Sequence, residues 1–263
     1  MMAVVIKDLT AIRRSKPIML PMAIVPVVLL VLVPLMVVLA ASAPGSGVGV
    51  DTLLDSMPDS ISRSISALPE KEQMVVLING YLMAPLFLVV PMMLASVLAA
   101  DAFAGEKERR TLESLLYLPI GDRALFYAKV LGAFVPAMAV SWFGFVIFAV
   151  VVNTAAWPLT HRVFIPTRLW MIMILWVAPA VAALGMGLMV RVSARVRTTQ
   201  EANQLGGAVI LPVIFLVVGQ STGLLIVTPL LAFTIGAVVW AIALWLIFRG
   251  AARFTRDRLA TSL

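Results

Sequence analysis

The sequence LGGAVILPVIFLVVGQSTGLLIVTPLLAFTIGAVVWAIALWLIF, residues 205–248, contains no charged residue. A helix needs about 20 apolar residues to cross the hydrocarbon core of a bilayer, so this run is long enough for two crossings. The sequence GQSTG at 219–223 is a polar turn signal near its middle. The run therefore predicts two membrane spans joined by a short turn, at about 202–218 and 224–248.

The composition of the whole chain places it in the membrane class. Hydrophobic residues make up 62% of the 263 residues and charged residues 13%, whereas a soluble domain has roughly 45–50% and about 25%. Four further apolar segments are long enough to cross a bilayer, at about 18–41, 74–100, 124–152 and 169–190. We therefore expect an all-α integral membrane protein with six transmembrane helices, which form one domain over residues 17–263.

The basic residues predict how the spans are oriented, because short cytoplasmic loops carry an excess of Lys and Arg. If the amino terminus is cytoplasmic, 16 of the 20 basic residues lie in inner segments. The four that lie outside are Arg63, Lys71, Arg162 and Arg168. We therefore expect both termini in the cytoplasm and an even number of spans. The basic residues are scattered over several loops, which argues against a nucleic-acid partner.

Ionisable and metal-binding residues are scarce in the predicted spans. No Asp, Glu, Lys, Arg or His falls deep inside a span, and Asp101 lies at the inner edge of the second. Proton and sodium pathways normally use such a group within the membrane, so ion coupling is disfavoured. The chain has no cysteine and one histidine, His161. Disulfides and thiolate chemistry are therefore excluded, and we expect no metal site.

Two segments outside the spans have helical periodicity. In residues 1–16, apolar side chains recur opposite charged ones, which is typical of an amphipathic helix at the cytoplasmic interface; a polar leader with chance periodicity is the alternative. The outer loop at 42–73 also contains an apolar helical stripe. It would form either a small cap over a pathway or a helix that rests on the outer leaflet, and we favour the second.

The sequence GEKERRTLESLLYLP, residues 105–119, is a highly charged stretch between the second and third spans. Strong helix formers stand between a glycine and a proline, which predicts a short helix. Its leucines share one face, and its glutamates and arginines can pair at three- and four-residue spacing. Such a helix is too short to be stable alone, so we expect it to dock on another surface. The alternative is a helix lying on lipid, where anionic lipid would repel its glutamates.

This stretch resembles the coupling helix of type-2 ABC exporter permeases, whose pattern is roughly E-x-E-x-x-T-L-E-x-L-L-x-x-P. The chain reads EKERRTLESLLYLP at Glu106–Pro119, and NQLGGAVILP at Asn203–Pro212 is similar to a second pattern of that family. Six spans with cytoplasmic termini extend the resemblance over nearly the whole chain. Arg110 and Leu118 depart from the family, whose commonest members carry Gly and Ser or Thr at these places.

The resemblance implies that the 17–263 domain is a permease of the cell inner (plasma) membrane. In that family two six-span subunits form the pathway, and two copies of a cytosolic ATP-binding subunit sit beneath them. The second permease would be another copy of this chain or a close relative. The residues implied to contact the ATPase subunit are Glu106, Glu108, Arg109, Arg110, Leu112, Glu113 and Leu116. The chain has no G-x-x-x-x-G-K-[ST] loop, so we expect no catalytic residue or cofactor in it, and ATP and Mg in the partner subunit.

The substrate pathway is predicted from the few polar and the larger apolar side chains of the spans. Its candidate lining residues are Asn79, Tyr81, Phe87, Met92, Ser96 and Phe143. Mostly apolar walls would suit a hydrophobic or amphiphilic cargo such as a drug, lipid or peptide; alternatively, these side chains face lipid or neighbouring helices. Two other functions stay open at this point, an ion-coupled secondary transporter and a membrane assembly scaffold.

Overall fold

The computed structural model describes residues 23–43, 54–55, 59–105, 108, 121–194, 196, 198–206, 211–221 and 228–253. Within these ranges all regular structure is helical, which confirms the predicted all-α class. The predicted amphipathic helix at residues 1–16 lies outside the described residues.

Five helices are long and apolar enough to cross a membrane. They cover Ala23–Ser42, Glu70–Gly105, Asp122–Thr160, Arg168–Ser193 and Pro229–Ala252. These helices match the predicted spans at 18–41, 74–100, 124–152, 169–190 and 224–248. The chain is therefore a multi-pass membrane protein.

The predicted span at 202–218 is not among these five helices. This region contains two shorter helices, α14 (Thr199–Gly206) and α15 (Leu211–Ser221), and residues 207–210 between them lie outside the described part of the chain. α15 packs against the second long helix. The sixth crossing therefore stays a prediction, as does the cytoplasmic placement of the termini.

Several of the long helices consist of consecutive α-helical and π-helical segments. The first contains η1 (Val28–Leu32) and α3 (Val33–Ser42). The segments of the second are α6 (Glu70–Leu77), η2 (Ile78–Leu82), α7 (Met83–Phe87), α8 (Val89–Ala100) and η3 (Asp101–Gly105). The fourth contains α12 (Arg168–Ile172), η4 (Met173–Val177) and α13 (Ala178–Ser193), whereas α11 (Asp122–Thr160) and α16 (Pro229–Arg253) are continuous.

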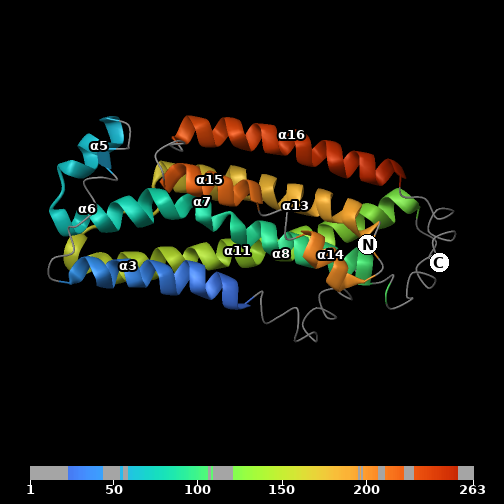
Figure 1. Cartoon of the computed structure of the whole chain (residues 1–263), viewed down its shortest axis with the longest axis horizontal. Coiled ribbons are helices and arrows are strands. Elements are labelled where there is room, and N and C mark those ends of the chain that lie inside the picture. The colour runs from blue at the N-terminus through green and yellow to red at the C-terminus, as the bar shows by residue number, and fades with distance from the viewer. Residues whose placement is uncertain are drawn as a thin grey trace.

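The long helices lie side by side, with α13 in the middle between α8 and α16, and with α11 against α8 and α3 (Figure 1). The most apolar stretches of the second and fourth helices are 67% buried, against 22–28% for the other three. The second and fourth helices therefore form the interior of the bundle. The outer helices expose large apolar side chains such as Met36, Phe143 and Leu230, as expected where lipid replaces water as the solvent.

Close packing at the centre depends on glycine. A Cβ atom at Gly185 would lie 2.7 Å from Ser96 Oγ and 3.1 Å from the Met92 carbonyl oxygen. On the other face of α13, a Cβ atom at Gly187 would lie 2.9 Å from Leu246 Cβ. Because lipid tails are as apolar as Leu, membrane helices associate through such close contacts rather than through hydrophobic burial.

The end of the bundle near α5 (Asp59–Ser66) is held together by contacts between separate segments. Leu54, Ile65 and Leu77 form a small buried cluster that fixes the predicted stripe of the 42–73 loop to the second long helix. The buried Glu72 forms an ion pair with Arg162, which follows α11. The start of the second long helix and the end of the third therefore lie at the same end of the bundle, as the alternating topology requires (Figure 1).

Candidate functional site

The candidate site is the charged segment that follows the second long helix, residues 105–118. The structure describes Gly105 and Glu108 of this segment. The other predicted contact residues, namely Glu106, Arg109, Arg110, Leu112, Glu113 and Leu116, lie outside the described residues, so their contact with an ATPase stays a prediction. The described parts of the chain show how the segment is attached on either side.

Glu108 attaches the segment to the start of α14. Its Oε2 atom accepts a hydrogen bond from the Thr199 backbone N–H at 2.9 Å and another from Thr199 Oγ1 at 2.7 Å. Thr199 is the first residue of α14, where backbone N–H groups have no partner within the helix and the helix dipole favours negative charge. A cap of this kind contributes about 0.5–2 kcal/mol, and the exposure of Glu108 places its contribution toward the lower end of that range.

α14 connects this attachment to the bundle interior. Thr198 Oγ1 accepts a further hydrogen bond from the backbone N–H of Glu201 at 3.2 Å, so a second side chain caps the same helix end. The helix packs against α8, η3 and α13, and its residue Ala202 is fully buried. A displacement of the charged segment would therefore reach the two central helices through Glu108 and α14.

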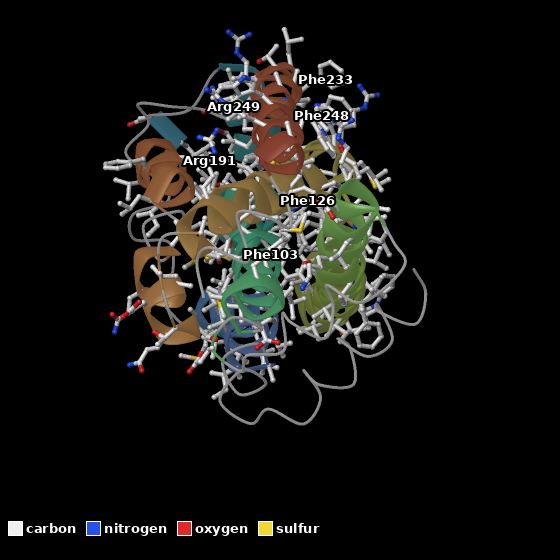
Figure 2. The ribbon with its side chains drawn as sticks, turned by 90° about the vertical axis from the view of Figure 1, so that its right-hand side faces the viewer. Phe103, Phe126, Arg191, Phe233, Phe248 and Arg249 are labelled. Carbon is white, nitrogen blue, oxygen red and sulfur yellow. The ribbon has the colours of Figure 1, made fainter. Side chains whose placement is uncertain are left out.

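Lys129 joins the two long helices that flank the segment. Its side chain is 1% exposed, and its Nζ atom donates a hydrogen bond to the Ala102 carbonyl oxygen at 2.8 Å. The same Nζ atom lies 5.5 Å from the centroid of the Phe103 ring, within the range of a cation–π interaction. Phe103 in turn packs on Phe126, with ring centroids 5.8 Å apart (Figure 2). The end of the second long helix is therefore bonded to the beginning of the third.

The position of Lys129 explains its burial. A buried ammonium group is costly unless hydrogen-bond acceptors or charges surround it, and the carbonyl groups at the C-terminal end of a helix are such acceptors because the dipole is negative there. Ala102 belongs to η3, the last turn before the charged segment, and the buried Asp101 belongs to the same turn. The two helices that flank the segment are therefore joined at the point where the segment begins.

Sequence analysis missed both attachments. It counted Lys129 only as one of the inner positive charges. A signal for its burial exists, because Leu125, Phe126 and Lys129 lie on one helical face and all three are buried. No comparable signal exists for the contact between Glu108 and Thr199, which are 91 residues apart in the chain.

Of the predicted pathway residues, the second long helix contributes five. Asn79, Phe87, Met92 and Ser96 are buried, and Tyr81 is half-buried. Phe143 projects from the outside of α11 and is 68% exposed. The structure thus brings the first five together along one helix and places Phe143 apart from them; their role in a pathway stays a prediction.

The buried members of this set contact the fourth long helix. Trp170 Nε1 donates a hydrogen bond to the Asn79 carbonyl oxygen at 2.9 Å, and the Trp170 ring lies 5.7 Å from that of Phe87 in an edge-to-face arrangement. Asn79 Nδ2 donates to the Val75 carbonyl oxygen at 3.2 Å, while Asn79 Oδ1 and Ser96 Oγ have no hydrogen-bond partner among the residues that the structure describes. Both orphaned atoms lie where the second and fourth helices meet.

Among the residues that the structure describes, no three His, Cys, Asp or Glu side chains lie close enough to one another to bind a metal ion. The geometry of these contacts favours a mechanical role for the site. Glu108 of the charged segment is bonded to α14, Lys129 joins the two helices that flank the segment, and the helices of the bundle are apolar enough to lie in lipid.

Comparison with known proteins tests this interpretation. No curated protein and no solved structure matches the chain. A family model described as "ABC-2 family transporter protein" matches residues 2–250, which is nearly the whole sequence. The chain therefore belongs to the ABC-2 transporter family, as a permease subunit of an ABC transporter that works with an ATP-binding subunit.

Proposed function

We propose that the protein is the membrane subunit of an exporter that moves its substrate outward with ATP hydrolysed by a separate subunit. Two copies of the ATP-binding subunit and a second permease, either this chain again or a close relative, complete the transporter. Family membership supports the permease role. The observation that carries the mechanism is the attachment of the charged segment to α14 through Glu108, beside the joint that Lys129 of α11 makes with η3.

The contacts of Glu108 and Lys129 support a simple path for movement. The ATP-binding subunits close on each other when ATP binds, and residues 105–118 seated in the ATPase follow that movement. Glu108 passes the displacement to α14, and Lys129 keeps the second and third long helices together at the moving end. The central packing of α8 and α13 then carries the displacement into the bundle.

The proposed orientation places the charged segment in the cytosol of a cell whose inner (plasma) membrane holds the bundle. Lys129, Arg191 and Arg249 lie at the end of the long helices near this segment, in keeping with the excess of positive charge on cytoplasmic sides. The opposite end contains Arg162, which is paired with Glu72. With α14 and α15 as the two parts of a sixth crossing, both termini lie in the cytosol.

A hydrophobic or amphiphilic substrate is the class that the composition favours. The buried lining residues Phe87 and Met92 are apolar, and the same long helix contributes two buried polar atoms, Asn79 Oδ1 and Ser96 Oγ, that have no hydrogen-bond partner among the described residues. Such a wall would attract an apolar body and offer it few polar partners. A drug, a lipid or an apolar peptide fits this description.

The test is co-expression with candidate ATP-binding subunits, followed by purification through a tag on this chain. We expect an ATP-binding subunit to co-purify and ATP-dependent uptake into inside-out vesicles or proteoliposomes to require it. Exchanging two predicted contact charges, by Glu113→Arg together with Arg109→Glu, should weaken both. Flux driven by an ion gradient without ATP would indicate a secondary transporter instead, and wild-type ATP-driven transport by the exchanged variant would refute the coupling role of the segment.

A further inference from the structure

A tryptophan lies close to two arginines at one end of the pair of helices α13 and α16. The guanidinium carbon of Arg191 lies 4.9 Å from the ring centroid of Trp245, and that of Arg249 lies 5.0 Å from it. Both distances are within the range of about 6 Å for cation–π attraction. Arg191 belongs to α13, whereas Trp245 and Arg249 belong to α16 one helical turn apart. The cluster therefore exists only because the two helices pack together.

The packing of α13 and its flanking η4 on α16 holds the cluster in place. Gly187, one turn before Arg191, lets Leu246 of α16 approach closely. Further along the pair, the Trp176 ring stacks on Phe233 with ring centroids 5.2 Å apart, and Trp240 Nε1 donates a hydrogen bond to the Trp176 carbonyl oxygen at 3.2 Å. These contacts fix the spacing of the two helices to which the arginines belong.

The two guanidinium groups carry positive charge that needs a counter-charge. Their central carbons are at most about 10 Å apart, given their distances from the common ring. Among the residues that the structure describes, neither group forms an ion pair with a carboxylate. A guanidinium group that lies over a ring keeps its N–H edge available for an oxyanion. The arrangement therefore suits a phosphate group, which several N–H donors can bind at once.

The described surface around the cluster contains large apolar side chains that are exposed. Trp245, Leu244 and Phe248 are 52%, 42% and 59% exposed. Figure 2 shows α16 at the edge of the bundle, with Arg191 and Arg249 on one flank and Phe248 on the other. Two arginines and a tryptophan next to an exposed apolar helix face form the pattern of a membrane–water boundary. A soluble phosphate would use only the charges, whereas a phospholipid would also use the apolar face.

We propose that Arg191, Trp245 and Arg249 form a binding site for an anionic phospholipid. The two guanidinium groups bind the headgroup phosphate, and an acyl chain lies along the exposed apolar face of α16. The basic end of the bundle assigns this lipid to the inner leaflet, where anionic lipids attract basic residues. The site lies outside the charged segment at 105–118, and its occupancy does not depend on an ATPase partner.

The test measures lipid binding to the purified full-length chain. The protein in detergent is titrated with phosphatidylglycerol or with phosphatidylcholine, and bound lipids are counted by native mass spectrometry. We expect tighter binding of phosphatidylglycerol. Arg191→Gln and Arg249→Gln should each weaken it about fivefold and the double variant about 25-fold, from about 1 kcal/mol for each basic residue near an anionic surface. Phosphatidylcholine binding should not change.

The matched control is Arg168→Gln, which removes one exposed arginine at the other end of the bundle and should leave the preference unchanged. The double variant with lysine at both positions keeps the charge and guards against a folding defect; it should still prefer phosphatidylglycerol. The proposal is overturned if the double glutamine variant binds phosphatidylglycerol as the wild type does, or if the control loses as much. It also fails if glycerol 3-phosphate competes as well as the lipid, or if the lysine variant loses the preference.

Discussion

Replacing Lys129 with methionine tests the joint between the second and third long helices. Methionine keeps most of the length and the apolar stem of the side chain, but it removes the hydrogen bond to the Ala102 carbonyl oxygen and the charge near Phe103. Both lost contacts are buried, because the Lys129 side chain is 1% exposed. We therefore expect the variant to be less stable than the wild type.

The size of the effect follows from the two contacts. A buried carbonyl group that loses its partner costs about 1–3 kcal/mol, and a desolvated cation–π contact contributes up to about 2 kcal/mol. Removing a buried ammonium group relieves part of its own desolvation cost, which leaves a net loss of about 2–3 kcal/mol. At roughly 2–4 °C for each kcal/mol in a chain of this size, the midpoint of thermal unfolding should fall by about 5–10 °C.

The assay is thermal unfolding of the purified chain in detergent, followed by intrinsic tryptophan fluorescence. The matched control is Lys71→Met, which removes the same group from an exposed position at the other end of the second long helix and should shift the midpoint by no more than about 1–2 °C. The reasoning about the joint is refuted if Lys129→Met unfolds at the wild-type temperature. It is also refuted if both variants lose the same amount, because burial would then not be the cause.

Three further predictions concern other contacts of the bundle. Glu108→Ala and Thr199→Val should each impair ATP-driven transport in the assembled transporter. The double variant should be no worse than the more affected single one, because both changes remove the same attachment, which contributes about 0.5–2 kcal/mol. Additive losses in a double-mutant cycle would count against this contact. Gly187→Leu should destabilise the chain by about 1–3 kcal/mol or more in thermal unfolding, since even a Cβ atom would lie 2.9 Å from a leucine of α16. An unchanged unfolding midpoint would show that α13 and α16 are not packed so closely. Arg162→Gln should leave the buried Glu72 without its partner and lower stability by about 1–2 kcal/mol, a value reduced because the arginine is exposed and screened by solvent. Adding Glu72→Gln to this variant should restore most of the lost stability. No restoration would refute the pairing.

Sequence analysis predicted where the long helices are, because the length of an apolar run is a physical requirement of the bilayer. It also predicted the family correctly from the stretch at 106–119. Its span at 202–218 stays a prediction, because the structure describes α14 and α15 there while residues 207–210 between them lie outside the described residues. Hydropathy alone does not decide whether this stretch is one span, since Gly206 and Pro212 are as compatible with a kinked membrane helix as with a helix end.

The sequence did not predict which side chains meet. The contacts of Glu108 with Thr199, and of Arg162 with Glu72, join residues 91 and 90 positions apart. Contacts of this kind depend on how the helices are placed next to one another. The periodicity of one helix does not predict which residues of a neighbouring helix it contacts. The expected absence of ionisable residues deep in the spans considered position in the sequence alone. It did not use the helical face that Lys129 shares with Leu125 and Phe126, which is buried in the structure.

The distribution of small residues, rather than hydropathy, indicates which helices form the interior of the bundle. The first long helix has the highest hydropathy of the five and is one of the two least buried, whereas the fourth has the lowest hydropathy and is one of the two most buried. In a bilayer, hydropathy measures compatibility with lipid, so it does not distinguish a lipid-facing helix from a central one. Small residues distinguish a central helix from a lipid-facing one, because they let helix backbones approach each other. The first ten residues of α13, which begins at Ala178, read APAVAALGMG and are rich in alanine and glycine. This helix packs against both α8 and α16. Gly185 and Gly187 contact opposite neighbours through positions where a single added carbon would collide. The density of small residues on two faces of one span therefore predicts its central place, and it does so from the sequence alone.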